Sequence, residues 1–251
     1  MPSSRFQALT HWLSKQFLNE SIALSPLSGD AGFRCYYRFS YQGTSYIAVD
    51  APGDKSNNAA FVFMQEKLSQ KSVLVPEIVA CDLSLGFFCL ADFGEILLSD
   101  ILSTQNMKVI YQKAITILPQ IQLALPQNTT ELPHYDKAFV ERELNIFPEW
   151  LLTKHLAITL TSDEHKQLAQ CFSILTENML IQPQVVVHRD YHSRNIMVLE
   201  NEELGIIDFQ DAVIGPITYD IVSLLRDCYL KWPAKQITPL LDNYIVMINQ
   251  Q

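Results

Sequence analysis

The sequence predicts an α+β fold with two lobes of unequal size: a small, mainly β N-terminal lobe and a larger, mainly helical C-terminal lobe. Two observations favour this class. The chain has 251 residues, of which 48% are hydrophobic and 18% are charged, so it can bury a substantial core. Strand-like patterns come first and helical patterns come later, which is typical of α+β proteins. We place the lobes at residues 1–92 and 93–251.

The N-terminal lobe is expected to contain two helices and a small sheet. Apolar residues recur at helical intervals in residues 4–19 and 58–71, which predicts a helix in each segment. Residues 33–39 and 45–49 are rich in aromatic and β-branched side chains and flank a Gln-Gly turn. This pattern predicts a β-hairpin between the two helices.

Two further strands and a series of helices are expected next. The strands are predicted at residues 76–80 and 86–90, and the segment that follows the second strand is the expected connector between the lobes. Beyond the connector the periodicity becomes helical. The predicted helices cover residues 107–125, 139–147 and 163–180.

A polar loop is predicted between short strands of the C-terminal lobe. A β-branched run at residues 185–187 predicts a strand, which leads into a polar octapeptide at residues 188–195. Residues 196–207 predict a hairpin of two more strands joined by a polar turn. Since the ends of a hairpin meet, Asn195 and Asp208 are expected to lie close together.

Asp190, Asn195 and Asp208 match three roles in kinase-like phosphoryl transfer. One aspartate accepts the hydroxyl proton, while an asparagine and a second aspartate hold Mg²⁺ against the phosphates of ATP. Oxygen ligands suit Mg²⁺. A single Asp at a strand end is more often a turn or cap residue, but three residue types at two required spacings favour catalysis. The alternative, a zinc pair of His188 and His192, requires a helix and further ligands.

Composition excludes some functions. The net charge of −9 argues against a nucleic-acid partner, because binding to the phosphate backbone needs an excess of Lys and Arg. The five cysteines are far apart and lack C-x-x-C spacing, as expected for reduced thiols. The sequence shows neither a signal-peptide pattern nor a span for a bilayer, so we expect a cytoplasmic protein without a membrane partner. Its oligomeric state is not indicated.

The motif around Asp190 resembles a known superfamily. The D-x-H-x-x-N form of residues 190–195 and the Ile207-Asp208-Phe209 segment are marks of the aminoglycoside phosphotransferase superfamily, whose members phosphorylate small molecules. Protein kinases usually have Lys where His192 stands, so a small-molecule acceptor is favoured. The resemblance runs across nearly the whole chain. It implies a bilobal, protein-kinase-like fold.

Four segments are similar to a narrower group, the bacterial N-acetylmuramate/N-acetylglucosamine anomeric kinases of cell-wall recycling. They are residues 29–38, 46–52, 142–150 and 215–229. The resemblance implies that ATP phosphorylates the C1 hydroxyl of an amino sugar. An anomeric hydroxyl is more acidic than an ordinary alcohol, so Asp190 need only orient it and accept its proton late.

The nucleotide is expected between the lobes. A Gly-containing hairpin at the start of the chain lies far upstream of the catalytic loop, as we call the octapeptide at residues 188–195. This order follows the layout of a bilobal kinase. Leu90 ends the second predicted strand and Asp92 belongs to the connector; backbone groups of this region are expected to bond an adenine edge. The expected phosphate-covering loop, whose alternative is a plain hairpin turn, consists of Ser28, Gly29, Asp30, Ala31 and Gly32.

One departure from kinase-like enzymes concerns the phosphates. The strand that usually carries a phosphate-binding lysine has none here, which leaves Arg34, Arg38 or Lys55 as candidates. Strand arginines are usually solvated or paired. Glu66 lies in a predicted helix, where a kinase-like lobe uses a glutamate to steady that lysine; the alternative is a solvated residue.

The segments between connector and catalytic loop usually shape the acceptor pocket in this family. Trp150 suits stacking on a sugar face, and its alternative is a plug in the core. Asp220 is expected to be a cap or an anchor for the backbone of the catalytic loop. The resemblance indicates these sugar-binding candidates: Arg142, Glu143, Glu149, Trp150, His192 and Asp227.

Two other functions remain open at the level of sequence. One is a kinase of the same fold that acts on an aminoglycoside or another small-molecule hydroxyl. The other is a nucleotide-binding module that has lost catalysis, which the missing strand lysine favours. Family members usually continue with more helices beyond the position of Gln251, so we expect a naturally short or truncated form.

Overall fold

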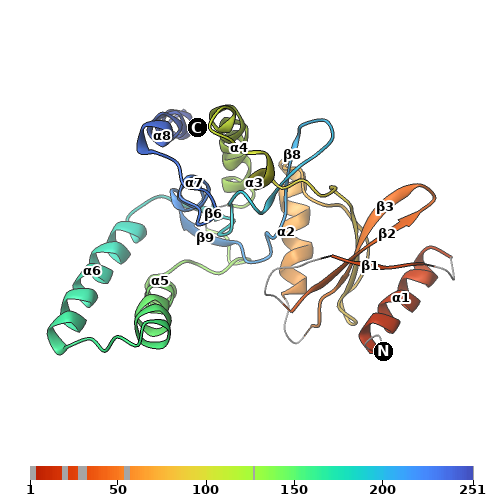
Figure 1. The fold of residues 1–251 in the computed structure, drawn as a ribbon, viewed down its shortest axis with the longest axis horizontal. Helices are drawn as coiled ribbons and strands as arrows, with labels where there is room; N and C mark the ends of the chain where they lie inside the picture. Colours follow the sequence, from red (N-terminus) through yellow and green to blue (C-terminus); the bar gives the residue numbers. More distant parts are fainter. Residues whose placement is uncertain (1–3, 19–21, 28–32, 54–56, 127, 251) are drawn as a thin grey trace.

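The computed structural model describes residues 4–18, 22–27, 33–53, 57–126 and 128–250. Within these residues, most strands belong to the first part of the chain and most helices to the second, so the predicted α+β class is confirmed. In Figure 1, the N-terminal helix and its neighbouring strands lie at one end of the molecule, and two helices of the C-terminal part lie at the other.

Five strands form one antiparallel sheet with the order β1-β2-β3-β5-β4. The predicted hairpin joins the second and third strands, and Gly43 adopts a φ of +82° in its turn, a value that favours glycine. The register places Tyr36 opposite Val49 and Arg38 opposite Ile47. The strands are β1 (Ser25–Pro26), β2 (Cys35–Tyr41), β3 (Thr44–Asp50), β4 (Ile78–Asp82) and β5 (Phe87–Ala91).

Two helices cover opposite faces of this sheet, and both were predicted. Helix α1 (Ser4–Gln16) packs on the outer face, where Ala48 shares a buried cluster with the apolar residues of the helix. Helix α2 (Asn58–Gln70) packs on the inner face, where Val49 lies in the same cluster as Phe61. Neighbouring residues of β3 point to opposite faces because side chains alternate along a strand.

The C-terminal part consists of helices around two small sheets. Strand β6 (Gln184–Val187) pairs with β9 (Val213–Pro216), and β7 (Ile196–Val198) pairs with β8 (Leu204–Ile206), so the predicted hairpin is confirmed. The sequence did not predict β9, because its Gly and Pro resemble a turn. The helices are α3 (Leu98–Ile101), α4 (Met107–Gln122), α5 (Lys137–Leu144), α6 (Ser162–Leu180), α7 (Tyr219–Leu225) and α8 (Ala234–Ile248).

A π-helix, η1 (Phe147–His155), stands where the sequence predicted the end of an ordinary helix. Helix α5 ends at Leu144, and Pro148 lies in the first turn of η1, where the missing N–H of proline costs no helical bond. Helix α6 follows, and in Figure 1 α5 and α6 lie side by side, away from the N-terminal sheet. No helix among the described residues is long and apolar enough to cross a bilayer.

One buried cluster connects the N-terminal sheet to the small sheets of the C-terminal part. At its centre, Phe61 of α2 stacks on Phe209, with ring centroids 5.0 Å apart and an angle of 10° between the rings. Phe209 follows Asp208 directly. The stack therefore places a helix of the N-terminal lobe next to the predicted metal ligands.

Candidate active site

Asp190 lies in the loop between β6 and β7. The carboxylate of Asp220 accepts hydrogen bonds from the backbone of that loop. The two oxygens of Asp220 accept hydrogen bonds from the backbone N–H groups of His188, at 2.8 Å, and Arg189, at 3.0 Å. Asp220 is only 1% exposed, at the start of α7. Its predicted role as an anchor of the loop is confirmed. Burial raises the pKa of Asp220 to about 7 in spite of the two backbone bonds.

Replacing Asp220 by Asn is expected to lower the free energy of unfolding by about 1–3 kcal/mol, because an amide nitrogen cannot accept one of the two backbone bonds. In the fold the pKa of Asp220 is about 7, whereas that of an unfolded Asp is about 3.9. The stabilising contribution of its proton is therefore complete below the unfolded pKa and is lost as the pH rises through the folded pKa. The destabilisation should be larger at about pH 5 than at about pH 8 when urea unfolding is measured.

The matched control for this variant is Asp242→Asn, because Asp242 is exposed on α8. It should leave the free energy of unfolding unchanged at both pH values. Equal destabilisation by Asp220→Asn at the two pH values would contradict the raised pKa of Asp220.

His188 supports Asp190 from inside the loop. Its Nε2 donates to the carbonyl oxygen of Ile207 at 3.0 Å, and its Nδ1 accepts from the backbone N–H of Asp190 at 3.2 Å. Burial lowers the pKa of His188 to about 4, so the ring is neutral near pH 7. Because both ring nitrogens are engaged in the loop, His188 does not suit a zinc pair with His192.

Arg189 ties the catalytic loop to helix α5. It has a φ of +77°, and its guanidinium forms an ion pair with Glu143. The hydroxyl of Tyr135 donates to the same carboxylate at 2.5 Å. Glu143, a predicted sugar-binding residue, therefore holds the loop through Arg189, which lies 46 positions later in the sequence.

Asn195 and Asp208 come together at the open end of the β7–β8 hairpin. The side-chain nitrogen of Asn195 donates to the carbonyl oxygen of Asp190 at 3.0 Å and lies 3.5 Å from a carboxylate oxygen of Asp208. The other oxygen of Asp208 accepts from Gln210 at 2.6 Å. The donor set of one amide oxygen and one carboxylate beside Asp190 fits a Mg²⁺ ion. These two residues would hold the metal.

The carboxyl group of Asp190 has a pKa above its ordinary value. Burial is the main cause, and the negative charge of Asp208 adds to it, whereas Arg189 and His192 act in the opposite direction. A carboxylate with a raised pKa is a stronger base. The environment of Asp190 therefore suits proton transfer.

A cleft with a volume of about 840 Å³ opens beside Asn195 and Asp208, between the N-terminal sheet and the β7–β8 hairpin. Three predicted nucleotide-binding residues, Arg34, Leu90 and Asp92, line it together with Asn195 and Asp208. The predicted loop from Ser28 to Gly32 lies outside the described residues. Further lining residues that the sequence did not indicate are Tyr36, Ile47, Phe93, Arg194 and Met197.

A sequence signal for one of these residues exists. Arg34, Tyr36 and Arg38 alternate along one strand and its approach, so they are expected on one face. All three line the cleft, which shows that this face is the inner one. The alternation therefore indicates Tyr36 as well as the two arginines.

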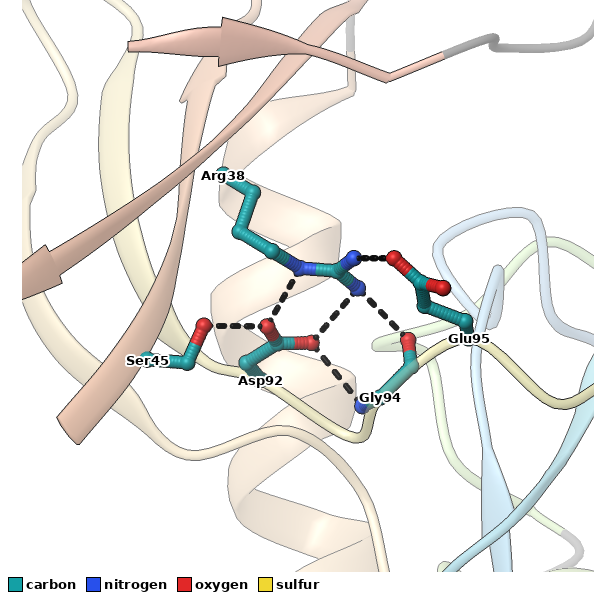
Figure 2. Close-up of polar contacts among 5 residues, drawn as sticks. All are labelled: Arg38, Ser45, Asp92, Gly94 and Glu95. Carbon is teal, nitrogen blue, oxygen red and sulfur yellow. Dashed lines mark hydrogen bonds and ion pairs between the residues drawn. The ribbon is translucent and has the colours of Figure 1, made fainter. Parts of the chain in front are cut away.

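The guanidinium of Arg38 is bonded to two acidic side chains and a backbone carbonyl group (Figure 2). It donates to both oxygens of Asp92, at 2.6 and 3.1 Å, and to the carbonyl oxygen of Gly94 at 2.7 Å. It also forms an ion pair with Glu95. Ser45 donates to Asp92 at 2.6 Å. The network fixes the connector to β2 and β3. The carboxylate of Asp92 is engaged in this network, so its role at the cleft is to hold the connector in position.

Asp227, another predicted sugar-binding residue, accepts hydrogen bonds from the catalytic loop. One of its oxygens accepts from the hydroxyl of Ser193 at 2.5 Å and from its N–H at 3.3 Å. The other accepts from the N–H groups of Tyr229, at 3.0 Å, and Leu230, at 2.7 Å. With both oxygens engaged, the carboxylate holds Ser193, which precedes Asn195 by two positions.

Among the sugar-binding candidates, His192 belongs to the catalytic loop itself, and its backbone N–H donates to the carbonyl oxygen of Asp190 at 3.0 Å. Its ring packs against Tyr229 with centroids 5.3 Å apart. The guanidinium carbon of Arg194 lies 4.7 Å from the centroid of the same Tyr229 ring. His192, Tyr229 and Arg194 thus form a polar and aromatic surface beside Asp190, the predicted base.

Three other sugar-binding candidates have their polar and ring contacts within α5 and η1. Arg142 packs over Phe139, at 4.8 Å, and Glu149 forms an ion pair with Lys154 at 2.9 Å. Trp150 is 57% exposed with the same lysine 3.6 Å from its ring centroid. The alternative of a core plug for Trp150 is therefore wrong, because the π-helix presents this ring to solvent.

Comparisons with known proteins identify the family of the chain. Residues 23–249 match the phosphotransferase enzyme family. The chain is similar to a protein of Pseudomonas putida named N-acetylmuramate/N-acetylglucosamine kinase, with 37% identity over 96% of this chain and 73% of the relative.

Solved structures show the same fold. Choline kinase LicA from Streptococcus pneumoniae has a TM-score of 0.69 at 14% identity, covering 96% of this chain and 80% of the other. The ADP-bound aminoglycoside phosphotransferase APH(2'')-Ib has a TM-score of 0.66 at 16% identity, covering 94% and 81%. The predicted kinase-like architecture is therefore confirmed. From the match over residues 23–249 and the identity to the Pseudomonas relative, the chain belongs to the phosphotransferase enzyme family.

Proposed function

We propose that this chain is an ATP- and Mg²⁺-dependent kinase that phosphorylates the anomeric C1 hydroxyl of N-acetylmuramate, N-acetylglucosamine or both, in peptidoglycan recycling. One structural observation carries the proposal. Asn195 and Asp208 line a cleft of about 840 Å³, and Asn195 is bonded to the backbone of Asp190. The choice of acceptor rests on the name of the Pseudomonas putida relative, which is 37% identical to this chain.

The residues divide the reaction between them. Asp190 orients the C1 hydroxyl and takes its proton as the sugar oxygen forms a bond to the γ-phosphorus, while the bond to the leaving ADP breaks. Asn195 and Asp208 would hold Mg²⁺, which supplies charge neutralisation at the phosphates. Since the protein forms no bond to the phosphoryl group, most of the catalysis comes from positioning.

The nucleotide and the sugar occupy different sides of Asp190 in this proposal. Leu90 and the connector that Arg38 fixes contact the base, in the apolar part of the cleft. We place the sugar against His192 and Tyr229. Glu143 and Asp227 act on it indirectly, because their oxygens hold Arg189 and Ser193 of the loop.

The remaining parts of the proposal concern organisation and location. We place the boundary between the lobes at residue 92, where β5 has ended and the connector begins. The five cysteines form no disulfide with one another in the described residues, which agrees with a cytoplasmic location.

The test is an assay of several sugars with ATP and Mg²⁺. N-acetylmuramate or N-acetylglucosamine should lose its reducing end as ADP forms, and NMR should place the phosphate on C1. Kanamycin serves as the competing acceptor. Transfer to kanamycin alone would overturn the sugar assignment, and no transfer from either ATP or GTP to any acceptor would overturn the proposed kinase activity.

A further inference from the structure

The position of the usual phosphate-binding lysine is apolar in this chain. Strand β3 contains neither Lys nor Arg. Its residue in the cleft wall is Ile47, and Val49 is buried at 3% exposure. A kinase-like site nevertheless needs a fixed cation at the nucleotide phosphates, because several negative charges lie close together there.

Three arginines line the described part of the cleft, and their surroundings differ. Arg38 donates to Asp92, Glu95 and Gly94, so its charge is neutralised and its donors are engaged. Arg194 packs on the ring of Tyr229, next to the proposed acceptor site. Arg34 lies immediately before β2, in the N-terminal part of the chain.

Arg34 is held by an aromatic ring. Its guanidinium carbon lies 5.3 Å from the ring centroid of Phe61, and Phe61 in turn stacks on Phe209 at 5.0 Å. Since Phe209 follows Asp208, this column of side chains positions the guanidinium relative to the proposed metal ligand. Arg34, Tyr36 and Asp208 all line the same cleft. Burial raises the pKa of the Tyr36 hydroxyl, Arg34 acts in the opposite direction, and the charge of Asp208 adds to the increase.

Among the residues that the structure describes, the glutamate that usually steadies the lysine has no counterpart paired with Arg34. Glu66, the predicted candidate on α2, has a side chain that is 59% exposed, and it interacts with Lys67 and Gln70. The described residues place no carboxylate within ion-pair distance of Arg34. A ring face attracts a guanidinium without neutralising it and leaves its N–H groups available for phosphate oxygens.

We propose that Arg34, positioned by stacking on Phe61, binds the nucleotide phosphates in place of the strand lysine and its glutamate partner. This inference rests on the proposed function only in requiring that the cleft bind a nucleoside triphosphate. It does not depend on which acceptor is phosphorylated.

The test compares a ligand that carries phosphates with one that lacks them. Calorimetry should show that Arg34→Ala binds Mg-ATP roughly ten-fold or more weakly than the wild type, the expected loss for charge-assisted bonds to phosphate. Its affinity for adenosine, measured by displacement of a fluorescent nucleotide, should stay unchanged. Arg34→Lys should recover part of the affinity for Mg-ATP, because lysine restores the charge but not the planar fork.

A second variant tests the positioning role of Phe61. Phe61→Leu keeps an apolar side chain but removes the ring under Arg34, so it should weaken Mg-ATP binding more than adenosine binding. In the background of Arg34→Ala, the same substitution should no longer change the ratio of the two affinities. Lys71→Ala is the matched control, because it removes a positive charge from the exposed end of α2.

Three results would overturn the inference. They are Mg-ATP affinity of Arg34→Ala within about two-fold of the wild type, an equal loss for adenosine and Mg-ATP, and an equal loss in the Lys71→Ala control. If the wild type binds Mg-ATP but phosphorylates no sugar, the acceptor proposal alone fails, and a selective loss in Arg34→Ala still supports this inference.

Discussion

Replacing Asp190 by Asn is expected to reduce turnover by roughly 10²–10⁴-fold, the usual contribution of a general base. The loop should keep its shape, because Asp190 makes its contacts to His188 and Asn195 through backbone atoms that the substitution retains. Nucleotide affinity should therefore stay close to that of the wild type. Steady-state kinetics and calorimetry with Mg-ATP measure the two quantities separately.

The control for this variant is Asp242→Asn on the exposed face of α8, which should leave turnover unchanged. Equal turnover of Asp190→Asn and the wild type on every sugar would remove Asp190 from the role of base. Loss of nucleotide binding together with turnover would indicate a structural role for the residue instead.

Replacing Asp208 by Asn is expected to lower turnover by roughly 10²-fold or more, since a bound metal contributes several kcal/mol of charge stabilisation. Asn is the appropriate substitution for two reasons. Asp208 has a φ of +67°, a region that Asn tolerates well, and an amide oxygen can still accept the bond from Gln210. The change therefore removes the charge and retains the local shape.

The distinguishing measurement for Asp208→Asn is nucleotide affinity with and without Mg²⁺. In the wild type, Mg²⁺ should strengthen ATP binding, and the variant should lose much of this increase. Glu200→Gln, in the exposed turn between β7 and β8, serves as the charge control. An unchanged effect of Mg²⁺ in Asp208→Asn would show that another group holds the metal.

The local pattern predicted most elements around the site. The β-hairpin at Gly43, helices α1 and α2, and the pair β7–β8 all formed where apolar periodicity and turn residues indicated them. Strand β9 and the π-helix η1 were not predicted. The hydrogen bonds that define β9 come from β6, far away in the chain, so its own four residues carry little signal.

The acceptor side was less predictable for the same reason. Glu143 and Asp227 were assigned to the sugar site from the family resemblance. The sequence does not show what their oxygens contact. Only the folded chain brings Glu143 to Arg189 and Asp227 to Ser193. These partners lie 46 and 34 positions apart, respectively, beyond the reach of any local pattern.

The sequence by itself determined the α+β class, the order of the elements and the three residues that mark phosphoryl transfer, because these depend on short-range periodicity and spacing. Tertiary structure alone decided how the arginines of the cleft differ. Arg38 lies among acidic groups and Arg34 lies on an aromatic ring, although the two residues are only four positions apart and line the same cleft. The charge that an arginine offers to a phosphate depends on these neighbours, which come from the connector and from α2.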